Sequence, residues 1–87
     1  MTIVVELYGV ARSKAGIERI PVEGETIGAA LAALERACPA LAGAVIDGGR
    51  LSEHYRLSLN GRRFVSDPAR RLADGDRLLL LSAEAGG

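Results

Sequence analysis

Residues 77–87 read RLLLLSAEAGG and combine the two features that decide the fold, a short leucine-rich strand and a final stretch of small residues. A strand with apolar side chains on both faces is typical of the middle of a sheet, where both faces are covered. Because side chains alternate along a strand, Leu78 and Leu80 share one face and Leu79 and Leu81 share the other. The run predicts a central strand, with Leu78 and Leu80 facing a helix and Leu79 and Leu81 facing outward.

The first quarter of the chain predicts a hairpin. Residues 3–8 are mostly β-branched and apolar, as in an interior strand, and residues 17–23 predict a second strand. The small, basic stretch 9–16 between them, bracketed by glycines, is interpreted as the connection. Pro21 cannot donate a ladder hydrogen bond, so the second strand is expected at a sheet edge.

The stretch 24–38 predicts one amphipathic helix. Thr26 is a suitable N-cap, and Pro39 ends the helix because the residue before a proline is pushed out of helical geometry. Apolar residues follow one another at helical spacing and form a single stripe, consisting of Ile27, Leu31, Leu34 and Cys38.

The second half of the chain predicts a loop followed by more strands. Residues 40–54 carry a turn signal at 47–49 and no sustained period, so a loop with a short helical turn is expected. Residues 55–59 alternate, and Asn60-Gly61 is a strong hairpin signal that leads into a return strand over 62–65. The remaining turn signals, which flank a predicted short helical piece, are Asp67-Pro68 and Asp74-Gly75-Asp76.

Composition excludes several classes of function. The 87 residues, 48% hydrophobic, are enough for one domain with one core. Eleven basic and eleven acidic residues give zero net charge, and aromatics are only 3%, so neither nucleic acid nor a membrane is expected as a partner. One cysteine forms no internal disulfide, and the first residues lack signal-peptide features, so a cytoplasmic protein is expected.

Taken in order, these segments resemble the MoaD/ThiS sulfur carriers of the ubiquitin-like β-grasp fold, and most of all MoaD, the small subunit of molybdopterin synthase. The stretches that carry the resemblance are LYGVARSKAG at 7–16, ETIGAAL at 25–31, LSLNG at 57–61, LADGDRL at 72–78 and the final Gly86-Gly87. The chain departs from common MoaD sequences at 82–85, where SAEA replaces a proline-containing stretch. The resemblance implies an α+β, ubiquitin-like β-grasp fold in which a mixed sheet of four to five strands packs on one main helix. Residues 1–82 would form this domain, and residues 83–87 a flexible tail.

The Gly-Gly pair has a chemical interpretation that does not depend on the resemblance. A carboxylate is a poor electrophile and accepts sulfur only after it is joined to a better leaving group, for example by adenylation. The sequence has no nucleotide-binding motif, so the ATP site is expected on a partner. Fully extended, residues 83–87 span roughly 17 Å, and glycine passes through a narrow channel without side-chain clashes. Gly87 is therefore the predicted reactive residue, and Gly86 is predicted to give it access.

The resemblance implies a carrier rather than an enzyme, with no cofactor bound to the chain itself. A MoeB/ThiF-like adenylyltransferase, holding ATP and Mg, would activate Gly87, and a sulfurtransferase would supply persulfide sulfur to form a thiocarboxylate. The acceptor in molybdopterin synthase is precursor Z, bound by the MoaE-like large subunit. Sulfur transfer for cysteine, thiamine or tRNA thiolation and conjugation to protein lysines through Gly87 remain alternatives. So does an interaction module without tail chemistry.

The outward-facing Leu79 and Leu81, helped by Phe64, are predicted to form the partner-docking surface. Cys38 is expected in the core, and His54, without a second ligand nearby in sequence, is expected at the surface. Asp74 and Asp76 are interpreted as turn residues and not as calcium ligands. Arg12 and Lys14 fit either an anionic ligand or a solvated loop, and the arginine pairs at 62–63 and 70–71 are expected to be solvated.

Overall fold

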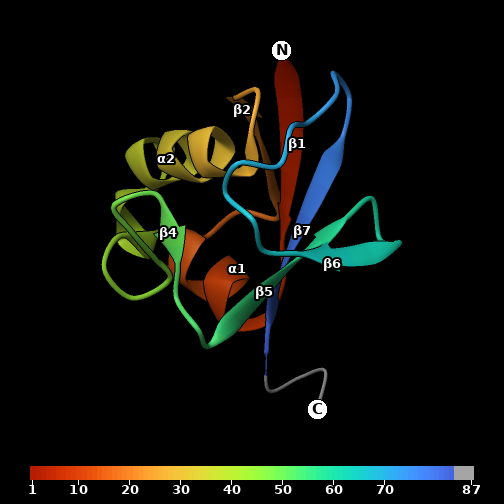
Figure 1. Cartoon of the computed structure of the whole chain (residues 1–87). Coiled ribbons are helices and arrows are strands. Elements are labelled where there is room, and N and C mark those ends of the chain that lie inside the picture. Colours follow the sequence, from red (N-terminus) through yellow and green to blue (C-terminus); the bar gives the residue numbers. More distant parts are fainter. Residues whose placement is uncertain (84–87) are drawn as a thin grey trace.

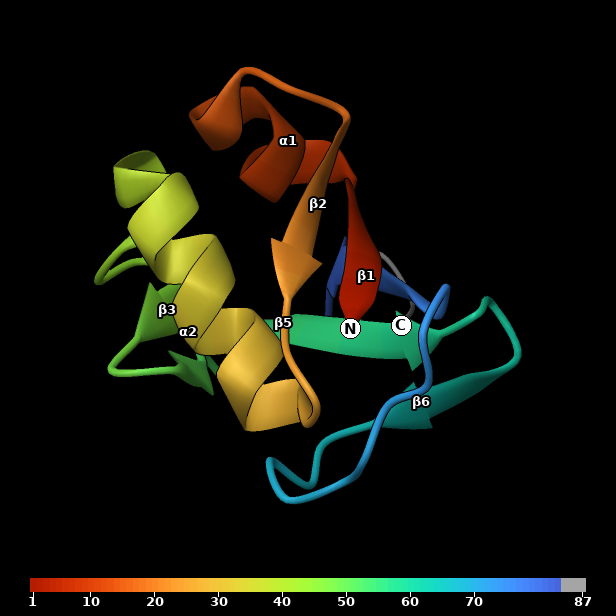
Figure 2. The same ribbon diagram turned by 90° about the horizontal axis from the view of Figure 1, so that it is seen from above.

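The computed structural model describes residues 1–83 as a five-stranded mixed sheet with its main helix on one face (Figures 1 and 2). The strands are β1 (Thr2–Leu7), β2 (Arg19–Glu23), β5 (Tyr55–Leu59), β6 (Arg63–Val65) and β7 (Arg77–Ser82), in the order β2-β1-β7-β5-β6. β1 and β7 are parallel and the other neighbours are antiparallel. The predicted central position of β7 and the edge position of the strand with Pro21 are both confirmed.

Helix α2 (Ile27–Ala37) forms where the capping and periodicity signals place it. The Thr26 hydroxyl oxygen accepts a hydrogen bond from the Ala29 N–H at 3.1 Å, and the helix ends before Cys38-Pro39. All four residues of the predicted stripe are buried, Cys38 included. Figure 2 shows α2 lying against one side of the twisted sheet.

The core forms between α2 and the inner face of the sheet. Leu78 and Leu80 of β7 are completely buried, together with Ile3, Val5 and Leu7 of β1. The register pairs Val5 with Leu78 and Leu7 with Leu80, so these side chains share one face. Leu79 and Leu81 lie on the opposite face and are half-buried. This confirms the prediction that they face away from the helix.

The connection over 9–16 is not a loop, contrary to the sequence interpretation. It forms a two-turn helix, α1 (Gly9–Ala15), which closes on Gly16 in the left-handed region with φ 74°, and the Gly16 N–H donates to the Arg12 carbonyl. Ala11 is its one buried residue, while Val10 stays half exposed. Such a short helix with a single core contact has no apolar stripe, so periodicity did not reveal it.

The segment after β6 also differs from the prediction, because residues 66–76 contain turns and one bridge, between Arg71 and Thr26, but no helical piece. Its carbonyl groups satisfy backbone donors at the start of α2. The Ile27 N–H donates to the Arg70 carbonyl at 3.0 Å, and the Gly28 N–H donates to the Pro68 carbonyl at 2.9 Å. These amides have no partner within the helix. The segment is thus tied to the helix terminus by backbone hydrogen bonds.

The predicted loop over 40–54 contains more regular structure than expected. A 3₁₀ turn, η1 (Pro39–Leu41), is followed by a small hairpin of β3 (Ile46–Asp47) and β4 (Arg50–Leu51) around the predicted turn. The Glu35 carboxylate of α2 accepts the Gly49 N–H at 2.9 Å, which ties this hairpin to the helix. A contact 14 residues away in sequence is not visible to local pattern analysis.

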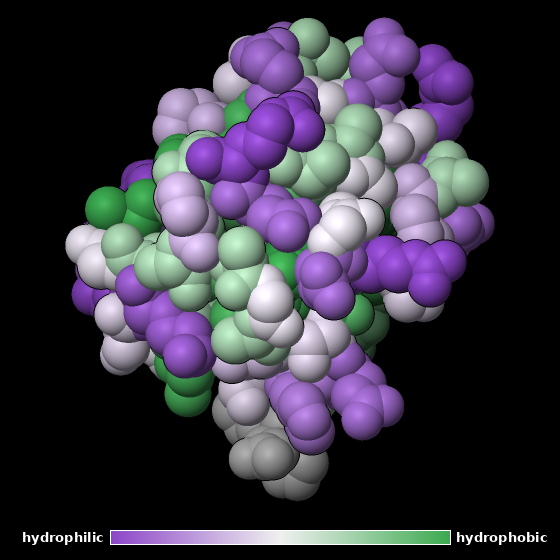
Figure 3. Space-filling model, turned by 90° about the vertical axis from the view of Figure 1, so that its left-hand side faces the viewer, coloured by the Kyte–Doolittle hydropathy of each residue, from purple (hydrophilic) through white to green (hydrophobic). Residues whose placement is uncertain are grey.

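Strand β7 ends at Ser82, next to the predicted boundary between the domain 1–82 and the tail 83–87. That boundary stays a prediction because residues 84–87 lie outside the described residues. On the side of the molecule that carries α2, hydrophobic side chains are interspersed with hydrophilic ones (Figure 3). Within residues 1–83, no helix has the length and apolar character needed to cross a membrane.

Replacing Gly24 with alanine is expected to destabilise the fold. An added Cβ would lie 2.7 Å from the backbone nitrogen and 3.0 Å from the Cα of Ala30, and neither atom can move without shifting α2. We expect the free energy of unfolding to fall by about 1–3 kcal/mol, the usual range for overpacking. Urea unfolding followed by circular dichroism measures this change. The exposed Ser13→Ala control should stay within about 0.5 kcal/mol of the native chain, and a Gly24→Ala midpoint equal to that of the control would contradict the steric argument.

Candidate functional site

The predicted tail leaves the sheet from a well-anchored position. The Ala83 N–H donates to the His54 carbonyl at 2.8 Å, one residue beyond the end of β7. On the other side of β7, the Tyr8 N–H donates to the Leu80 carbonyl at 3.1 Å. The base of the tail is therefore held between the start of β5 and the end of β1. Gly86 and Gly87, the predicted reactive end and its neighbour, lie outside the described residues.

The helix-free face of the sheet, here called the outer face, carries all three predicted docking residues. The register aligns Leu79 of β7 with Ser58 of β5, and Ser58 with Phe64 of β6. Leu79 and Phe64 are thus two strand spacings apart, roughly 10 Å, with the small Ser58 between them. Leu81 lies one pair further along β7, opposite Arg56. The structure brings the three residues onto one surface, while their docking role stays a prediction.

Phe64 is the most exposed large hydrophobic residue of this set, with 59% of its surface accessible. Its ring is not isolated, because the Arg56 guanidinium lies over it at 5.2 Å from the centroid. Such a cation–π contact fixes the orientation of both side chains. The apolar part of the outer face therefore has a cationic group next to Leu81, a feature that sequence reasoning missed.

A polar network occupies the β1 side of the outer face. The Glu6 carboxylate accepts hydrogen bonds from the Tyr8 hydroxyl at 2.8 Å and from the Arg77 guanidinium at 3.1 Å. The Tyr8 hydrogen bond and then Arg77 lower the pKa of Glu6, and the same hydrogen bond raises the pKa of Tyr8. Alternation places Glu6 and Tyr8 on one face, but only the parallel β1–β7 pairing brings Arg77 to them.

The Glu6 network predicts an acid-sensitive contribution to stability. Because the folded-state pKa of Glu6 lies below its ordinary 4.5, the contribution is present above pH 4.5 and is lost as the pH falls through the folded-state value. Glu6→Gln should therefore lower the urea midpoint at pH 7, and this difference should shrink steadily below pH 4.5. Urea titrations from pH 7 to pH 3 measure it. A difference that stays constant over this range would contradict the assignment.

The other candidate residues have structural roles. Cys38 is buried, as predicted, and burial raises the pKa of its thiol. His54 is exposed and anchors Ala83 through its carbonyl group. Asp74 accepts the Thr2 N–H at 2.8 Å, and Asp76 accepts the Ala73 N–H at 2.8 Å. The two aspartates therefore fix the turn before β7, as the sequence indicated.

The predicted alternatives for the basic stretch in α1 are only partly decided. Arg12 forms an ion pair with Glu18, whereas Lys14 is exposed near the end of the helix. An intramolecular carboxylate thus occupies Arg12, which favours the solvated interpretation over an anionic ligand for this residue.

Comparison with known proteins adds structural relatives. No protein-family model matches the sequence, and no curated protein matches it either. Among solved structures, the small archaeal modifier protein SAMP1 from Haloferax volcanii has a TM-score of 0.84 and 31% identity over 100% of both chains. Mycobacterium tuberculosis CysO has a TM-score of 0.77 and 24% identity, covering 93% of this chain and 98% of CysO. A chain in the complex of subunits 1 and 2 of the molybdopterin-converting factor from Helicobacter pylori has a TM-score of 0.66 and 21% identity, covering 100% of this chain and 100% of that chain.

The sheet order, the main helix and these relatives define a ubiquitin-like β-grasp protein. The SAMP1 match extends over the whole chain at 31% identity. The chain belongs to the MoaD/ThiS family of ubiquitin-like sulfur carriers. The relatives are small carrier or modifier proteins.

Proposed function

We propose that this protein is a sulfur carrier activated at the carboxylate of Gly87. Membership of the MoaD/ThiS family, together with a Gly-Gly pair that follows the central strand β7, is the observation that supports this role. An ATP-dependent partner would join the carboxylate to AMP and release pyrophosphate. A persulfide sulfur would then attack the acyl carbon and displace AMP. Cleavage of the resulting acyl disulfide by a thiol would leave the thiocarboxylate.

The geometry of the tail exit suits this chemistry. Ala83 is hydrogen-bonded to His54, so the position from which the tail departs is rigid. Four further residues can carry the last carbonyl at most about 14 Å from Ala83. The partner must therefore bind close to the end of β7, and the outer face with Leu79 and Leu81 is the adjacent surface. Docking there would hold the carboxylate near the activating groups and supply a proximity effect.

For the destination of the sulfur, we propose the molybdopterin precursor bound to a MoaE-like large subunit. The Helicobacter pylori complex of molybdopterin-converting factor subunits 1 and 2 contains a chain of this fold. A small-subunit role would require only the exposed outer face and the tail, both of which this chain offers. Neither the activation of Gly87 nor the transfer of sulfur would need a cofactor on this chain, since the MoeB/ThiF-like adenylyltransferase would hold ATP and Mg.

A protein modifier is the second candidate, and the 31% identity with a small archaeal modifier protein favours it. Conjugation would share the activation of Gly87 and then form an amide with a lysine of another protein. Lys14 is the only lysine of this chain, so a polymer linked through lysine could grow only there.

Incubation of the full chain with a MoeB/ThiF-type adenylyltransferase, MgATP and a persulfide sulfurtransferase tests the proposal. Intact-mass analysis should show one oxygen replaced by sulfur. Adding the large subunit and precursor Z should then return the original mass and yield molybdopterin. A chain that is activated but appears instead as amide-linked adducts on other proteins would favour the modifier. No mass change with active partner enzymes would contradict both candidates.

A further inference from the structure

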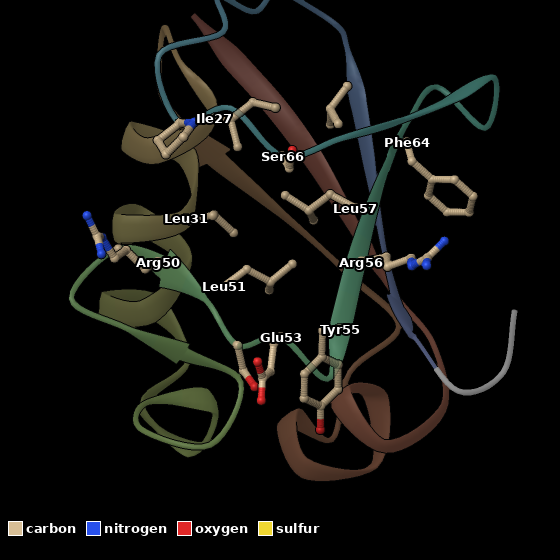
Figure 4. Close-up of a pocket in the computed structure, with 14 residues that line it drawn as sticks. Ile27, Leu31, Arg50, Leu51, Glu53, Tyr55, Arg56, Leu57, Phe64 and Ser66 are labelled. Carbon is tan, nitrogen blue, oxygen red and sulfur yellow. The ribbon is translucent and has the colours of Figure 1, made fainter. Parts of the chain in front are cut away.

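A second surface, on the helix side of the sheet, has the features of a binding site, and its lining includes Arg56 and Phe64 at the border with the outer face. A groove of about 420 Å³ lies on the inner side of the sheet, with α2 and β4 on one side and β5 and β6 on the other (Figure 4). Helix α2 packs against β2, β3 and β4 and leaves the β6 end of the sheet largely uncovered. Apolar side chains line the groove, chiefly Ile27, Leu31, Leu51, Leu57 and Val65. The groove is therefore an apolar surface that the fold itself does not fill.

Strand β6 forms one edge of the sheet beside this groove. An edge strand has backbone N–H and C=O groups available to an added strand, and a proline on the strand reduces that capacity. The opposite edge, β2, carries Pro21, whereas β6 has none. The β6 edge is thus the one suited to pairing with another chain.

The register of β6 shows which side chains an added strand would meet. Val65 pairs with Leu57 and Arg63 pairs with Leu59, so both lie on the helix side of the sheet, where Val65 lines the groove and Arg63 lies beyond its lining. Phe64 lies on the outer face (Figure 4). A residue added beside Val65 would cover the apolar floor, and the residue two positions away would lie beside Arg63.

The segments around the groove carry a net positive charge, and the lining itself holds Arg50, Arg56 and the acidic Glu53. Residues 50–71, which include β4, β5, β6 and the segment along the start of α2, contain six arginines and only two acidic residues, although the whole chain is neutral. All six arginines are exposed. Within residues 1–83, the ion pairs are Met1–Glu23, Arg12–Glu18 and Arg77–Glu6, and none of them uses an arginine of this group.

We propose that the groove and the β6 edge bind an extended segment of a partner protein in which aliphatic residues alternate with aspartate or glutamate. Strand addition would supply backbone hydrogen bonds, the groove would bury the aliphatic side chain, and the arginines would attract the acidic ones. An apolar floor suits such a peptide better than it suits a phosphate backbone. The site is independent of Gly87, so it provides a second contact beyond the proposed carrier function.

NMR titration of the isotopically labelled full chain tests this proposal. The probe is a capped octapeptide with two central aliphatic residues in alternation with glutamates, at low salt. Amide shifts are expected at Leu51, Leu57 and Val65, with little change at Leu79. Peptides in which lysine replaces glutamate, or serine replaces the aliphatic residues, should bind about tenfold more weakly or not at all.

Two valines, one in the groove and one outside it, provide a matched pair of variants. Val65→Glu puts a carboxylate on the groove floor and should weaken peptide binding about tenfold or more. Val10→Glu makes the same substitution at an exposed position of α1 that does not line the groove, and it should leave the affinity within about twofold. Arg63→Glu should weaken binding and reduce its dependence on salt. Deletion of Gly87 should leave peptide binding unchanged, which separates this result from the tail chemistry.

The proposal is wrong if millimolar peptide causes no shifts in the groove, or if the lysine peptide binds as well as the acidic one. Groove shifts that depend on protein concentration without peptide would identify a second copy of the chain as the occupant and would also overturn it. A well-dispersed amide spectrum of each variant confirms that it is folded. Should Val65→Glu unfold, Arg63→Glu and Val10→Glu still decide the outcome.

Discussion

Deletion of Gly87 is expected to abolish thiocarboxylate formation and to leave the folded domain unchanged. The shortened chain would end about 3.5 Å before the activating groups, and a misplacement of even 1 Å can cost about 100-fold in rate. The buried core residues lie between Ile3 and Leu80, so the urea midpoint should stay the same. The initial rate of thiocarboxylate formation, followed by intact mass, should fall at least about 100-fold.

Two variants of unchanged length separate the effect of tail length from the effect of side-chain size near the C-terminus. Gly86→Val keeps the last carboxylate in register but adds a branched side chain, which should also slow activation in a narrow channel. Ala85→Gly removes bulk and should be activated at the native rate. Thiocarboxylate formation on the Gly87-deleted chain at the native rate would place the reactive group elsewhere and refute the assignment.

The sequence predicted those elements whose signals are local. Thr26 and the apolar stripe identify α2, Pro21 identifies an edge strand, and alternation in the last strand separates Leu78 from Leu79. Helix α1 was missed because its two turns bury only Ala11. The stretch between the turn signals at Asp67-Pro68 and Asp74 was misinterpreted as helical, because this part of the chain accepts hydrogen bonds from the first amides of α2, some 40 residues away in sequence.

The candidate site was also predicted only where the sequence signal is local. The alternation of side chains along the last strand placed Leu79 and Leu81 on the outer face, and Phe64 was expected to join them there. The contacts that surround them, Arg56 over Phe64 and Arg77 on Glu6, connect residues of different strands. Their identification requires the pairing register, in particular the parallel alignment of β1 with β7. A central strand that pairs with both the first strand and β5 assembles one surface from three distant parts of the sequence.

Leu81→Glu is expected to weaken binding of the partner that docks on the outer face by about 30-fold or more, the effect of losing a hot-spot residue. Leu81 is half-buried on the helix-free side and lies one residue before the end of β7, beside the point where the tail leaves the predicted docking surface. A carboxylate there would be desolvated in the complex without a compensating hydrogen bond. Titration calorimetry with the large subunit measures the loss.

Ala29→Glu is the matched control, since it makes the same charge change on the exposed side of α2. It places a glutamate three residues after the Thr26 cap, which is the capping-box arrangement, and should not destabilise the fold. Its affinity for the large subunit should equal that of the native chain. Val65→Glu should likewise bind the large subunit normally, because the register places Val65 on the face of the sheet opposite Leu79 and Leu81. If Leu81→Glu binds as well as these two variants, the partner approaches the tail from another side, and the outer face is not the docking surface.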